Sequence, residues 1–583
     1  MAKIETIRHS LSHMMASAVQ ELFPGTKFGI GPAIENGFYY DFDLPRSLNP
    51  DDLRKIEGKM KNLIKENIVF TKKIVLKEKA KEIFKDQPYK LELIEKLPEE
   101  KMTIYQSGNF TDLCKGPHLK STFQLYSGQA KEIIDSFKLT KIAGAYWKGN
   151  EKNKMLTRIY GIAFETKKEL ENYFRIQEEA EKRDHRILGQ KLDLFSISDE
   201  VGAGLVIFHP KGAVIRSVIE DFWKKEHKKR GYQYVYSPHI GKLDLWKKSG
   251  HWEFYRESLY SPIEIEGVQY LLKPMNCPFH LQVYKSKIRS YKDLPIRYCE
   301  LGTVYRFEKT GTLHGLLRVR GFTQDDAHIF CSPDQINKEV EGVLDLACFM
   351  LNTFGFSNFE VELSVRDPKN KIKYLGSDKI WKKAENALGY SLKQKGLKYR
   401  IAEGEAVFYG PKIDIKLIDA LGRGWQGVTI QVDFNLPEKF DLNYIDEKGR
   451  KEKVVMIHHT VLGSVERFIG NLLEHYAGAF PLWLAPVQIW IIPVGSRHVK
   501  YANFVNEQLT TNNLRTQLRD ERETVSKKIR EGEIQKIPYL LVVGDKEMKS
   551  KSVRIRQRGK GDIGEMKLKK FFEKVKMEVE KKK

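Results

Sequence analysis

The chain has 583 residues, of which 41% are hydrophobic and 30% charged, and its formal net charge is +23. This length exceeds what a single hydrophobic core supports, so several domains are expected, and the composition excludes a largely disordered chain. The positive surplus favours a polyanionic partner, either nucleic acid or an acidic membrane surface. A basic surface kept for solubility is the alternative.

No segment has the pattern of a targeting or membrane-spanning sequence. The first residues carry charges without an apolar core, and the longest apolar stretch, 480–494, is interrupted by three prolines. The five cysteines are scattered and odd in number, which is typical of free thiols in a reducing compartment, some of them candidate metal ligands. We therefore expect a cytoplasmic protein that is not in a membrane.

Residues 1–160 form a first predicted block of mixed helix and strand. His9 and His13 are four residues apart and therefore share one face of a predicted helix. Three further residues able to bind a metal or activate water follow in this block: Asp112, Cys114 and His118. A zinc-peptidase helix is disfavoured because Ser10 stands where its glutamate belongs, and surface histidines on a capped helix are a further alternative.

The segment 161–189 is predicted to connect two domains. From Glu165 to Leu188 it contains neither Gly nor Pro, is dense in Glu, Lys and Arg, and repeats apolar residues near helical spacing. We expect one long, exposed helix here.

A larger block, 190–485, alternates helical segments with long strand-like ones. Its predicted strands include Pro295–Phe307, Leu317–Phe330, Gly427–Phe434 and Val454–His458. Long strands joined by short loops favour a mostly antiparallel sheet with appended helices over a doubly wound parallel sheet. No G-x-x-x-x-G-K-[ST] sequence is present, which argues against a P-loop nucleotide site.

One predicted strand of this block carries Gln324, Asp326 and His328 at alternate positions. Alternate residues of a strand share a face. Three polar groups on one face of a buried strand are costly unless they line a site. The pattern therefore predicts a functional site on this strand.

Arginines flank the glycine-containing loop 309–316 that precedes this strand. Arg306 and Glu308 are predicted on the strand before the loop, and Arg318 and Arg320 where the next strand opens. Taken together they predict a cradle for a triphosphate. Taken singly, each arginine would be interpreted as a surface ion-pair partner.

A second basic position follows a strand predicted to end at His458. Gly463 and Ser464 lead into a helix with Glu466 and Arg467 in its first turns. A cation near a helix N-terminus is unfavourable, so Arg467 is expected to meet an anion such as phosphate. An exposed helical arginine is the alternative.

The last block, 486–583, has a βαβ rhythm that predicts a small α/β domain. Predicted strands at Val487–Pro493 and Tyr539–Gly544 alternate with helices near Tyr501–Asn512 and Ser526–Glu533. Basic residues concentrate at its end, among them Arg554, Arg556 and Arg558. Such a surface is expected to contact nucleic acid.

Two longer patterns resemble motifs 2 and 3 of the class II aminoacyl-tRNA synthetases. The first is Arg306-x-Glu308 with Arg318 and the run RGFTQDDAH at 320–328, and the second is GSVERF at 463–468. With KPMNCP at 273–278 and YGPK at 409–412, the chain resembles the threonyl-tRNA synthetases, essentially throughout and in order. These motifs are long and specific.

The resemblance implies an α+β multidomain protein. It implies an N-terminal α+β editing domain (1–160), a linker helix (161–189), a class II catalytic core on an antiparallel sheet (190–485) and a C-terminal α/β anticodon-binding domain (486–583). The implied activity is ATP-dependent activation of threonine to threonyl-adenylate, transfer to tRNA(Thr), and hydrolytic editing of mischarged seryl-tRNA(Thr). The implied partners are tRNA(Thr), ATP and L-threonine, and the implied assembly is a homodimer. We interpret the sequence as a form without the extra small N-terminal domain that many members carry.

The resemblance also assigns individual residues. The nucleotide, bound with Mg²⁺, is implied to meet Arg306, Glu308, Arg318 and Arg467. One zinc ion per subunit is implied at Cys277, His328 and His458. Threonine is implied to contact Met275, Gln324, Asp326, Tyr409, Gln426 and Gln431. Editing is implied to use His9, His13, Tyr40, Lys90, Asp112, Cys114 and His118, with a metal-free site preferred although the sequence leaves the metal open.

The pairing of zinc with an editor answers a chemical problem that threonine poses. An apolar pocket separates threonine from the similarly shaped valine by only about a hundredfold. A zinc ion that ligates both the amino group and the hydroxyl rejects valine, and Asp326 is expected to accept the hydroxyl's hydrogen bond. Serine keeps both groups and lacks only a methyl, worth about 1–3 kcal/mol, so seryl-tRNA is expected to need hydrolysis.

Two positions depart from the family pattern. Phe279 stands where a glycine is usual, and His459 where an arginine is usual, beside His458. A strand directs only one of two adjacent side chains inward, and the resemblance selects His458. Two rival functions are a regulator that has lost catalysis and a free-standing editing hydrolase, and the intact motif arginines and zinc ligands argue against both.

Overall fold

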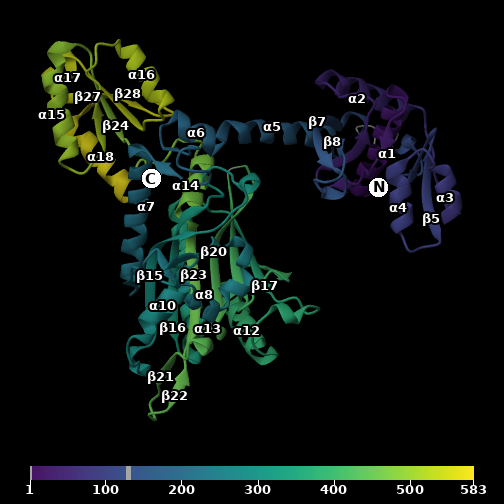
Figure 1. Cartoon of the computed structure of the whole chain (residues 1–583). Helices are drawn as coiled ribbons and strands as arrows, with labels where there is room; N and C mark the ends of the chain where they lie inside the picture. The colour runs from purple at the N-terminus through teal and green to yellow at the C-terminus, as the bar shows by residue number, and fades with distance from the viewer. Residues whose placement is uncertain (1–2, 127–132, 420, 583) are drawn as a thin grey trace. The chain divides into compact units, whose positions relative to one another are not determined.

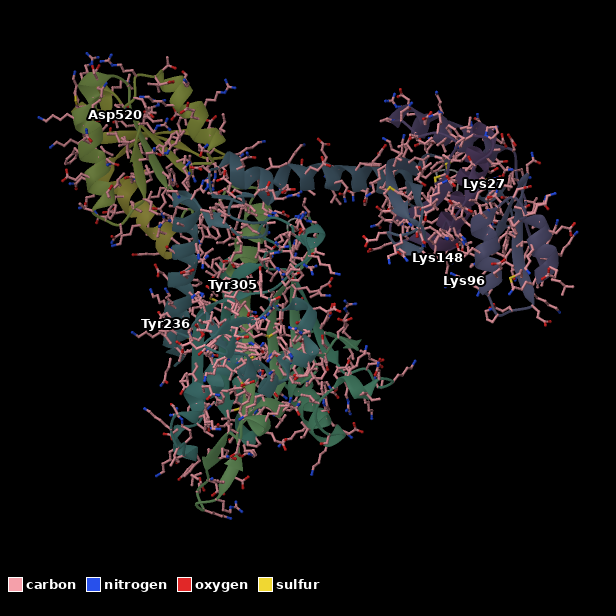
Figure 2. The ribbon with its side chains drawn as sticks, in the orientation of Figure 1. Lys27, Lys96, Lys148, Tyr236, Tyr305 and Asp520 are labelled. Atoms are coloured by element: carbon pink, nitrogen blue, oxygen red, sulfur yellow. The ribbon has the colours of Figure 1, made fainter. Side chains whose placement is uncertain are left out.

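The computed structural model describes residues 3–126, 133–419 and 421–582. They form two compact units, one up to Glu178 and one from Glu179 onward, and each is considered by itself (Figure 1). In Figure 2 the three labelled lysines lie on the first unit, and Tyr236, Tyr305 and Asp520 lie on the second. No helix in the described part of the chain has the length and apolarity needed to cross a membrane.

The first unit packs helices against antiparallel strands. Its helices are α1 (Ile4–Leu22), α2 (Pro50–Lys65), α3 (Lys77–Ile83) and α4 (Pro88–Lys96). Helix α2 begins with a capping box, in which Asn49 and Asp52 exchange side-chain-to-backbone bonds of 3.0 Å, so two otherwise unpaired N–H groups are satisfied. The buried face of α1, including Leu11 and Met15, packs into the main core of this unit.

Two sheets complete the first unit. In the larger one the order is β1-β3-β8-β7, with β2 paired to β3, and in the smaller one it is β4-β5-β6. The larger sheet comprises β1 (Lys27–Phe28), β2 (Ala33–Ile34), β3 (Gly37–Asp43), β7 (Phe137–Tyr146) and β8 (Met155–Ala163). The smaller comprises β4 (Phe70–Leu76), β5 (Lys101–Ser107) and β6 (Phe110–Leu113).

The predicted connecting helix is divided in two. Helix α5 spans Lys167–Arg183 and helix α6 spans His185–Lys191, so Asp184 separates the two helices. The prediction of one helix to Leu188 is wrong because the Asp184 side chain accepts a 2.8 Å bond from the Arg186 N–H and so starts a new helix. The predicted exposure is confirmed for α5, because Leu170 is the one residue of this helix, all of which the structure describes, that is buried.

An eight-stranded sheet organises the second unit, in the order β11-β15-β16-β23-β20-β19-β17-β18. Its two outermost pairs are parallel and the six inner strands run antiparallel, as the sequence predicts. The strands are β11 (Gln233–Tyr234), β15 (Ile296–Tyr305), β16 (Gly321–Cys331), β17 (Phe359–Val365), β18 (Arg400–Glu403), β19 (Lys412–Ile418), β20 (Gly424–Asp433) and β23 (Val455–Ser464).

The two faces of the central strands have opposite character. On β16, Ala327 and Ile329 point into the main core, where Val340 and Ala347 of α11 (Ile336–Thr353) also lie. Burying an isoleucine stabilises the fold by about 1.5–3 kcal/mol. Gln324, Asp326 and His328 of the same strand are polar and face the other way, so this side of the sheet is free to form a site.

Several strand boundaries differ from the sequence predictions. Strand β15 ends at Tyr305, so Arg306 and Glu308 follow it, and β16 begins at Gly321, after Arg318 and Arg320. Strand β23 continues past His458 to Ser464 and leads directly into α14 (Val465–His475).

The remaining elements of residues 190–485 complete this part of the chain. The helices are α7 (Pro210–Lys229), α8 (Leu243–Ser249), α9 (His251–Phe254), α10 (Cys277–Lys285), α12 (Asp378–Gln394) and α13 (Asn435–Lys439). The small sheets comprise β9 (Phe195–Ser196), β10 (Ile207–Phe208), β12 (Ile240–Lys242), β13 (Ile263–Ile265), β14 (Val268–Leu272), β21 (Asn443–Ile445) and β22 (Lys451–Lys453).

The C-terminal segment forms the predicted small α/β fold around a five-stranded sheet of order β25-β24-β26-β27-β28. The first three strands of this order are parallel and the rest antiparallel. The strands are β24 (Ile489–Pro493), β25 (Thr516–Leu518), β26 (Tyr539–Val543), β27 (Ser552–Gln557) and β28 (Gly561–Lys567). The helices are α15 (Val499–Thr510), α16 (Val525–Ile534), α17 (Asp545–Ser550) and α18 (Leu568–Glu580).

Candidate active sites

The polar face of the eight-stranded sheet lines a cavity of about 360 Å³. Its walls include every residue that the sequence assigns to threonine or zinc: Met275, Cys277, Gln324, Asp326, His328, Tyr409, Gln426, Gln431 and His458. Arg306 and Glu308 also line it. The structure therefore brings together stretches of sequence that lie far apart in the chain.

Cys277, His328 and His458 converge in this cavity. Cys277 is the first residue of α10, and the register of β16 with β23 places His328 directly opposite His458. One ligand-type atom from each residue lies within 4.8 Å of the others, and all three residues are buried. We call them the core cluster.

Polar groups behind the two imidazoles of the core cluster orient them. Asp433 Oδ2 lies 2.9 Å from His458 Nε2, and His280 Nδ1 lies 2.7 Å from His328 Nδ1. His280 Nε2 in turn meets Glu300 Oε2 at 3.1 Å. Each ring of the cluster keeps its other nitrogen for a further ligand, and carboxylates behind imidazoles are typical of metal sites.

The protonation of the core cluster depends on burial. Burial raises the pKa of the Cys277 thiol well above its usual range, and the nearby Asp326 and Asp433 carboxylates raise it further. Burial also lowers the pKa of His328, which stays unprotonated. A thiol and two imidazoles amid carboxylates form a donor set that fits a divalent cation, with zinc preferred for sulfur and nitrogen ligands.

Asp326 lies beside the core cluster and has a partner that the sequence interpretation missed. Asn276 Nδ2 donates to Asp326 Oδ2 at 3.1 Å, and Asp326 Oδ1 is 3.6 Å from His328 Nε2. Burial raises the pKa of Asp326, while His280 and the Asn276 bond act in the opposite direction. Asn276 stands within the KPMNCP run, so its position in a quoted motif was the only sequence signal for it.

A second cavity, of about 230 Å³, adjoins the first because both are lined by Arg306, Glu308 and Gln324. Arg318 and Arg467 line only the second. Glu308 pairs with Arg318, whose Nη2 is 2.9 Å from Glu308 Oε2. The four residues that the sequence assigns to the nucleotide therefore surround one space.

The half-buried arginines of this space, Arg306 and Arg467, lack anionic partners in the part of the chain that the structure describes. Arg306 Nε donates to the Pro274 carbonyl at 3.3 Å, and Arg467 Nε to the Leu317 carbonyl at 3.0 Å. Neither forms an ion pair within residues 3–126, 133–419 and 421–582. Burial lowers the pKa of both guanidinium groups, and for Arg467 the neighbouring Arg306 adds to the effect. Such desolvated cations favour an anionic ligand.

Arg320 has a different place from the one predicted. Its Nε donates to the Glu308 carbonyl at 2.9 Å and its Nη1 to the Ala203 carbonyl at 3.3 Å. Arg320 therefore braces the loop before β16, whereas Arg318 faces the cavity.

The start of α14 is shaped by Asp325, which points away from the cavity. Between Gln324 and Asp326, β16 advances two residues while β23 advances four, so β23 bulges. The Asp325 carboxylate accepts bonds of 2.8–2.9 Å from the three N–H groups of 461–463. These bonds replace the interrupted ladder and lead the chain into the helix that carries Arg467.

The two adjacent histidines of β23 face opposite sides of the sheet. His459 Nε2 lies 2.7 Å from the Tyr232 hydroxyl, whereas His458 belongs to the core cluster. This arrangement follows from the alternation of side chains along a strand.

The first unit holds the second predicted cluster. His9 and His13 extend from α1, and one ligand-type atom of each lies within 4.8 Å of the corresponding atoms of Cys114 and His118. We call these four residues the editing cluster. Cys114, His9 and His118 are half-buried, so the cluster is accessible from one side.

The polar atoms of the editing cluster contact one another and the nearby backbone. His9 Nδ1 is 3.2 Å from the Pro117 carbonyl, so this nitrogen carries the proton and His9 Nε2 is free to accept one. Cys114 Sγ lies 3.3 Å from both His9 Nε2 and His118 Nε2. Burial raises the pKa of the Cys114 thiol to about 11 and lowers that of His118 to about 2. The cluster is therefore uncharged at neutral pH.

A charged group adjoins this cluster. Asp112 forms an ion pair with buried Lys90 and accepts a 2.7 Å bond from the Tyr40 hydroxyl. Its Oδ2 is also 3.4 Å from His13 Nε2. All seven residues that the sequence assigns to editing thus lie together in one unit.

The C-terminal arginines differ in their surroundings. Arg554 pairs with Asp562 at 2.8 Å on an exposed part of β27. Arg558, in contrast, is mostly buried and its Nη2 donates to the Ala479 and Phe480 carbonyls. Arg558 therefore attaches the C-terminal segment to the preceding chain, which leaves it less exposed than Arg554.

Three family descriptions match successive parts of the chain. Residues 102–160 match "Threonyl and Alanyl tRNA synthetase second additional domain", residues 260–476 match "tRNA synthetase class II core domain (G, H, P, S and T)", and residues 488–578 match "Anticodon binding domain". With the antiparallel sheet and its cavities, they define a class II aminoacyl-tRNA synthetase.

Curated relatives identify the particular family. A threonine–tRNA ligase of Dehalococcoides mccartyi is 53% identical over 95% of this chain and 93% of its own length. One of Acidobacterium capsulatum is 51% identical over 98% of this chain and 83% of its own. The structure called the RNA binding domain of threonyl-tRNA synthetase from Cryptosporidium parvum has a TM-score of 0.65 at 38% identity, covering 68% of this chain and 98% of that one. The chain belongs to the threonine–tRNA ligase family, whose members use ATP with Mg²⁺.

Proposed function

We propose that the chain activates L-threonine with ATP, transfers it to tRNA(Thr), and hydrolyses seryl-tRNA(Thr) in its first unit. The observation that carries this proposal is the convergence of Cys277, His328 and His458 beside Asp326 in one buried cavity. A cavity for a purely apolar amino acid would not need buried polar groups of this kind.

The threonine site is proposed to lie in the 360 Å³ cavity. Asp326, oriented by Asn276, would accept a hydrogen bond from the side-chain hydroxyl of threonine. Gln426 Nε2 donates to Asp414 Oδ1 at 3.0 Å, and Gln431 Nε2 to the Gly410 carbonyl at 3.3 Å. The remaining proposed contacts are Gln324, Tyr409 and Met275.

The core cluster is proposed to hold one zinc ion, because its residues fit the ion in donor type, burial and outer hydrogen bonds. Asp433 and the His280–Glu300 pair would keep His458 and His328 unprotonated at the ligating nitrogen. When bound, zinc would supply a Lewis-acid position able to ligate an amino group and a hydroxyl together. Valine cannot supply the second of these groups.

The nucleotide is proposed to occupy the second cavity. Arg306 and Arg467 provide charge for its phosphates, and the Arg318–Glu308 pair would contact the rest of the nucleotide. With Mg²⁺, these groups would orient the α-phosphate toward the threonine carboxylate in the adjoining cavity. Catalysis here is positioning and charge stabilisation of the attack.

The editing cluster is proposed to hydrolyse the seryl ester without a metal. His9 is half-buried, and its Nε2 carries no proton in this tautomer and lies against Cys114 Sγ, so it is suited to accept a proton from water; Lys90 is suited to stabilise charge that develops on the ester oxygen. The other proposed contributors are His13, Tyr40, Asp112, Cys114 and His118.

The wider assembly is also part of the proposal. The C-terminal α/β segment would read the anticodon, with exposed Arg554 and half-buried Arg556 on β27. We propose a cytoplasmic homodimer, with the domain divisions near residues 160, 189 and 485. Light scattering of the purified chain tests the assembly, and a monomeric mass would refute the dimer.

Pyrophosphate exchange with threonine, valine and serine tests the activity. We expect exchange with threonine, weaker exchange with serine, none with valine, and one zinc per chain. No exchange with any amino acid would refute the synthetase, and equal exchange with valine and threonine would refute recognition of the hydroxyl. Deacylation of seryl-tRNA(Thr), measured on the same preparation, tests the editing unit separately.

A further inference from the structure

His185, the first residue of α6, joins three segments that are distant in sequence. It is fully buried, and its Nδ1 lies 2.7 Å from Glu474 Oε1 near the end of α14. Its Nε2 lies 3.0 Å from the backbone nitrogen of Leu316, in the loop before β16. A backbone N–H only donates, so Nε2 accepts and Nδ1 carries the proton that is donated to Glu474.

This group is not a metal site, although Asp184, His185 and Glu474 have ligand-type atoms close together. Both nitrogens of His185 already have partners. Asp184 accepts the Arg186 N–H at the start of α6, and the second oxygen of Glu474 pairs with Arg423. The arrangement is a complete hydrogen-bond network with a fixed tautomer, which is a means of holding a loop.

The loop that His185 holds also contacts the nucleotide cavity. The residue after Leu316 is Leu317, whose carbonyl accepts the bond from Arg467 Nε. The next residue, Arg318, lines the cavity and pairs with Glu308. The His185 imidazole accepts a hydrogen bond from the Leu316 N–H, and the Arg467 guanidinium donates one to the Leu317 carbonyl. The two side chains therefore hold adjacent residues of one loop.

Two glycines allow these segments to approach one another. Gly315 has a φ of +48°, and a Cβ there would lie 2.1 Å from His185 Nε2. A Cβ at Gly470 of α14 would lie 3.0 Å from Leu317 Cδ2 and 3.2 Å from Leu316 Cβ. Any side chain at Gly315 would displace either the loop or the imidazole.

The end of α5 is fixed to the same helix. Arg183 Nη1 donates to the His475 carbonyl at 2.9 Å, at the C-terminal end of α14, where a cation also favours the helix dipole. The connector therefore meets both the loop before β16 and the helix whose first turn carries Arg467.

We propose that His185 is a positioning residue for nucleotide binding. Its unprotonated Nε2 sets the place of the loop 313–319, and through it that of Arg318 and of the carbonyl that orients Arg467. The inference rests on the proposed synthetase function, and it assigns a role to a residue outside both cavities.

Two amide substitutions separate the two bonds of His185. His185→Gln places an oxygen near the position of Nε2, where it can accept the Leu316 N–H. His185→Asn keeps a donor for Glu474 but is too short to reach Leu316. We expect His185→Asn to raise the KM for ATP in threonine-dependent pyrophosphate exchange about tenfold, with the KM for threonine within about twofold. His185→Gln should stay within about threefold of the parent for ATP.

A matched glycine pair tests the loop from its other side. Gly315→Ala is expected to raise the KM for ATP as His185→Asn does. Gly396→Ala, which also replaces a positive-φ glycine (φ +63°) but with no atom near its Cβ, should leave it unchanged. If folding of His185→Asn is impaired, Gly315→Ala carries the test.

These experiments distinguish a failure of the positioning role of His185 from a failure of the proposed synthetase function. An inactive parent chain refutes the synthetase. An active parent with equal ATP constants in His185→Asn and His185→Gln, or with ATP and threonine constants that rise together, refutes the positioning role. An unchanged ATP constant in Gly315→Ala also refutes it.

Discussion

The core cluster and the editing cluster use the same side-chain types in different surroundings. Each brings histidine and cysteine ligand-type atoms within 4.8 Å. Behind the core cluster stand carboxylates, Asp433 directly and Glu300 through His280. Beside the editing cluster stands the Lys90–Asp112 pair, and its cysteine already contacts two imidazoles and the Gly116 N–H.

Under the proposed function, the surroundings of the two clusters decide which of them binds a metal. Negative charge behind the core cluster favours a cation, whereas the Lys90 charge lowers the pKa of His13 further after burial and disfavours one. The same residue types are therefore suited to bind zinc in one unit and to orient water in the other.

Removal of one cysteine from each cluster tests this contrast most strongly. Cys277→Ala is expected to abolish zinc binding and to reduce threonine-dependent pyrophosphate exchange by at least about 100-fold, because the ion loses a ligand. Cys114→Ala should leave both unchanged. Elemental analysis and exchange assays measure the two effects. A loss of zinc in Cys114→Ala would show that the editing cluster also binds the metal.

A smaller effect is expected behind the imidazoles. Asp433→Asn weakens the hydrogen bond that orients His458, so zinc affinity should fall about 10–100-fold while the ligands remain. Tyr40→Phe, which removes a hydroxyl bound to Asp112 in the editing unit, is the matched control. Competition with a chelator measures both variants. Equal affinity in Asp433→Asn and the parent would contradict the orienting role.

The smallest effect is a near-absence of pH dependence in editing. Burial lowers the pKa of His9, His13 and His118, so these imidazoles stay unprotonated as pH falls. Deacylation of seryl-tRNA(Thr) should therefore decline only at a pH below about 6.5, where an ordinary histidine base titrates. A decline with a midpoint near pH 6.5 would contradict this.

The lowered pKa values of these three histidines also affect stability, and they make the stability of the fold depend on pH. In the unfolded chain the three histidines take up protons below about pH 6.5, and in the folded unit they do not. The free energy of unfolding should therefore fall as pH drops below that value, while the editing rate of the folded protein persists.

The sequence predicts the polar face of β16 well, because alternation along a strand is local. Gln324, Asp326 and His328 share the cavity as expected. The meeting of Cys277 with His458 is not local, since it depends on the order of strands and on where α10 begins. Family resemblance suggests it, and no spacing rule does.

Other differences arise from side chains that act on the backbone. Strand β23 extends past His458 because Asp325 satisfies the amides of its bulge, and the connector is divided because Asp184 starts a helix. His280 and Asp433 were missed as supporting residues because they belong to no quoted motif. Each becomes visible only when the segments around it are in place.

The bulge at 461–463 means that the two ends of β23 are positioned by different contacts. Up to Thr460, β23 is held in register by strands on both sides, which fixes His458. Beyond it, a carboxylate on a third segment decides where α14 starts. A residue gained or lost in the bulge should therefore shift Arg467 more than His458, so that it changes the proposed nucleotide site more than the core cluster.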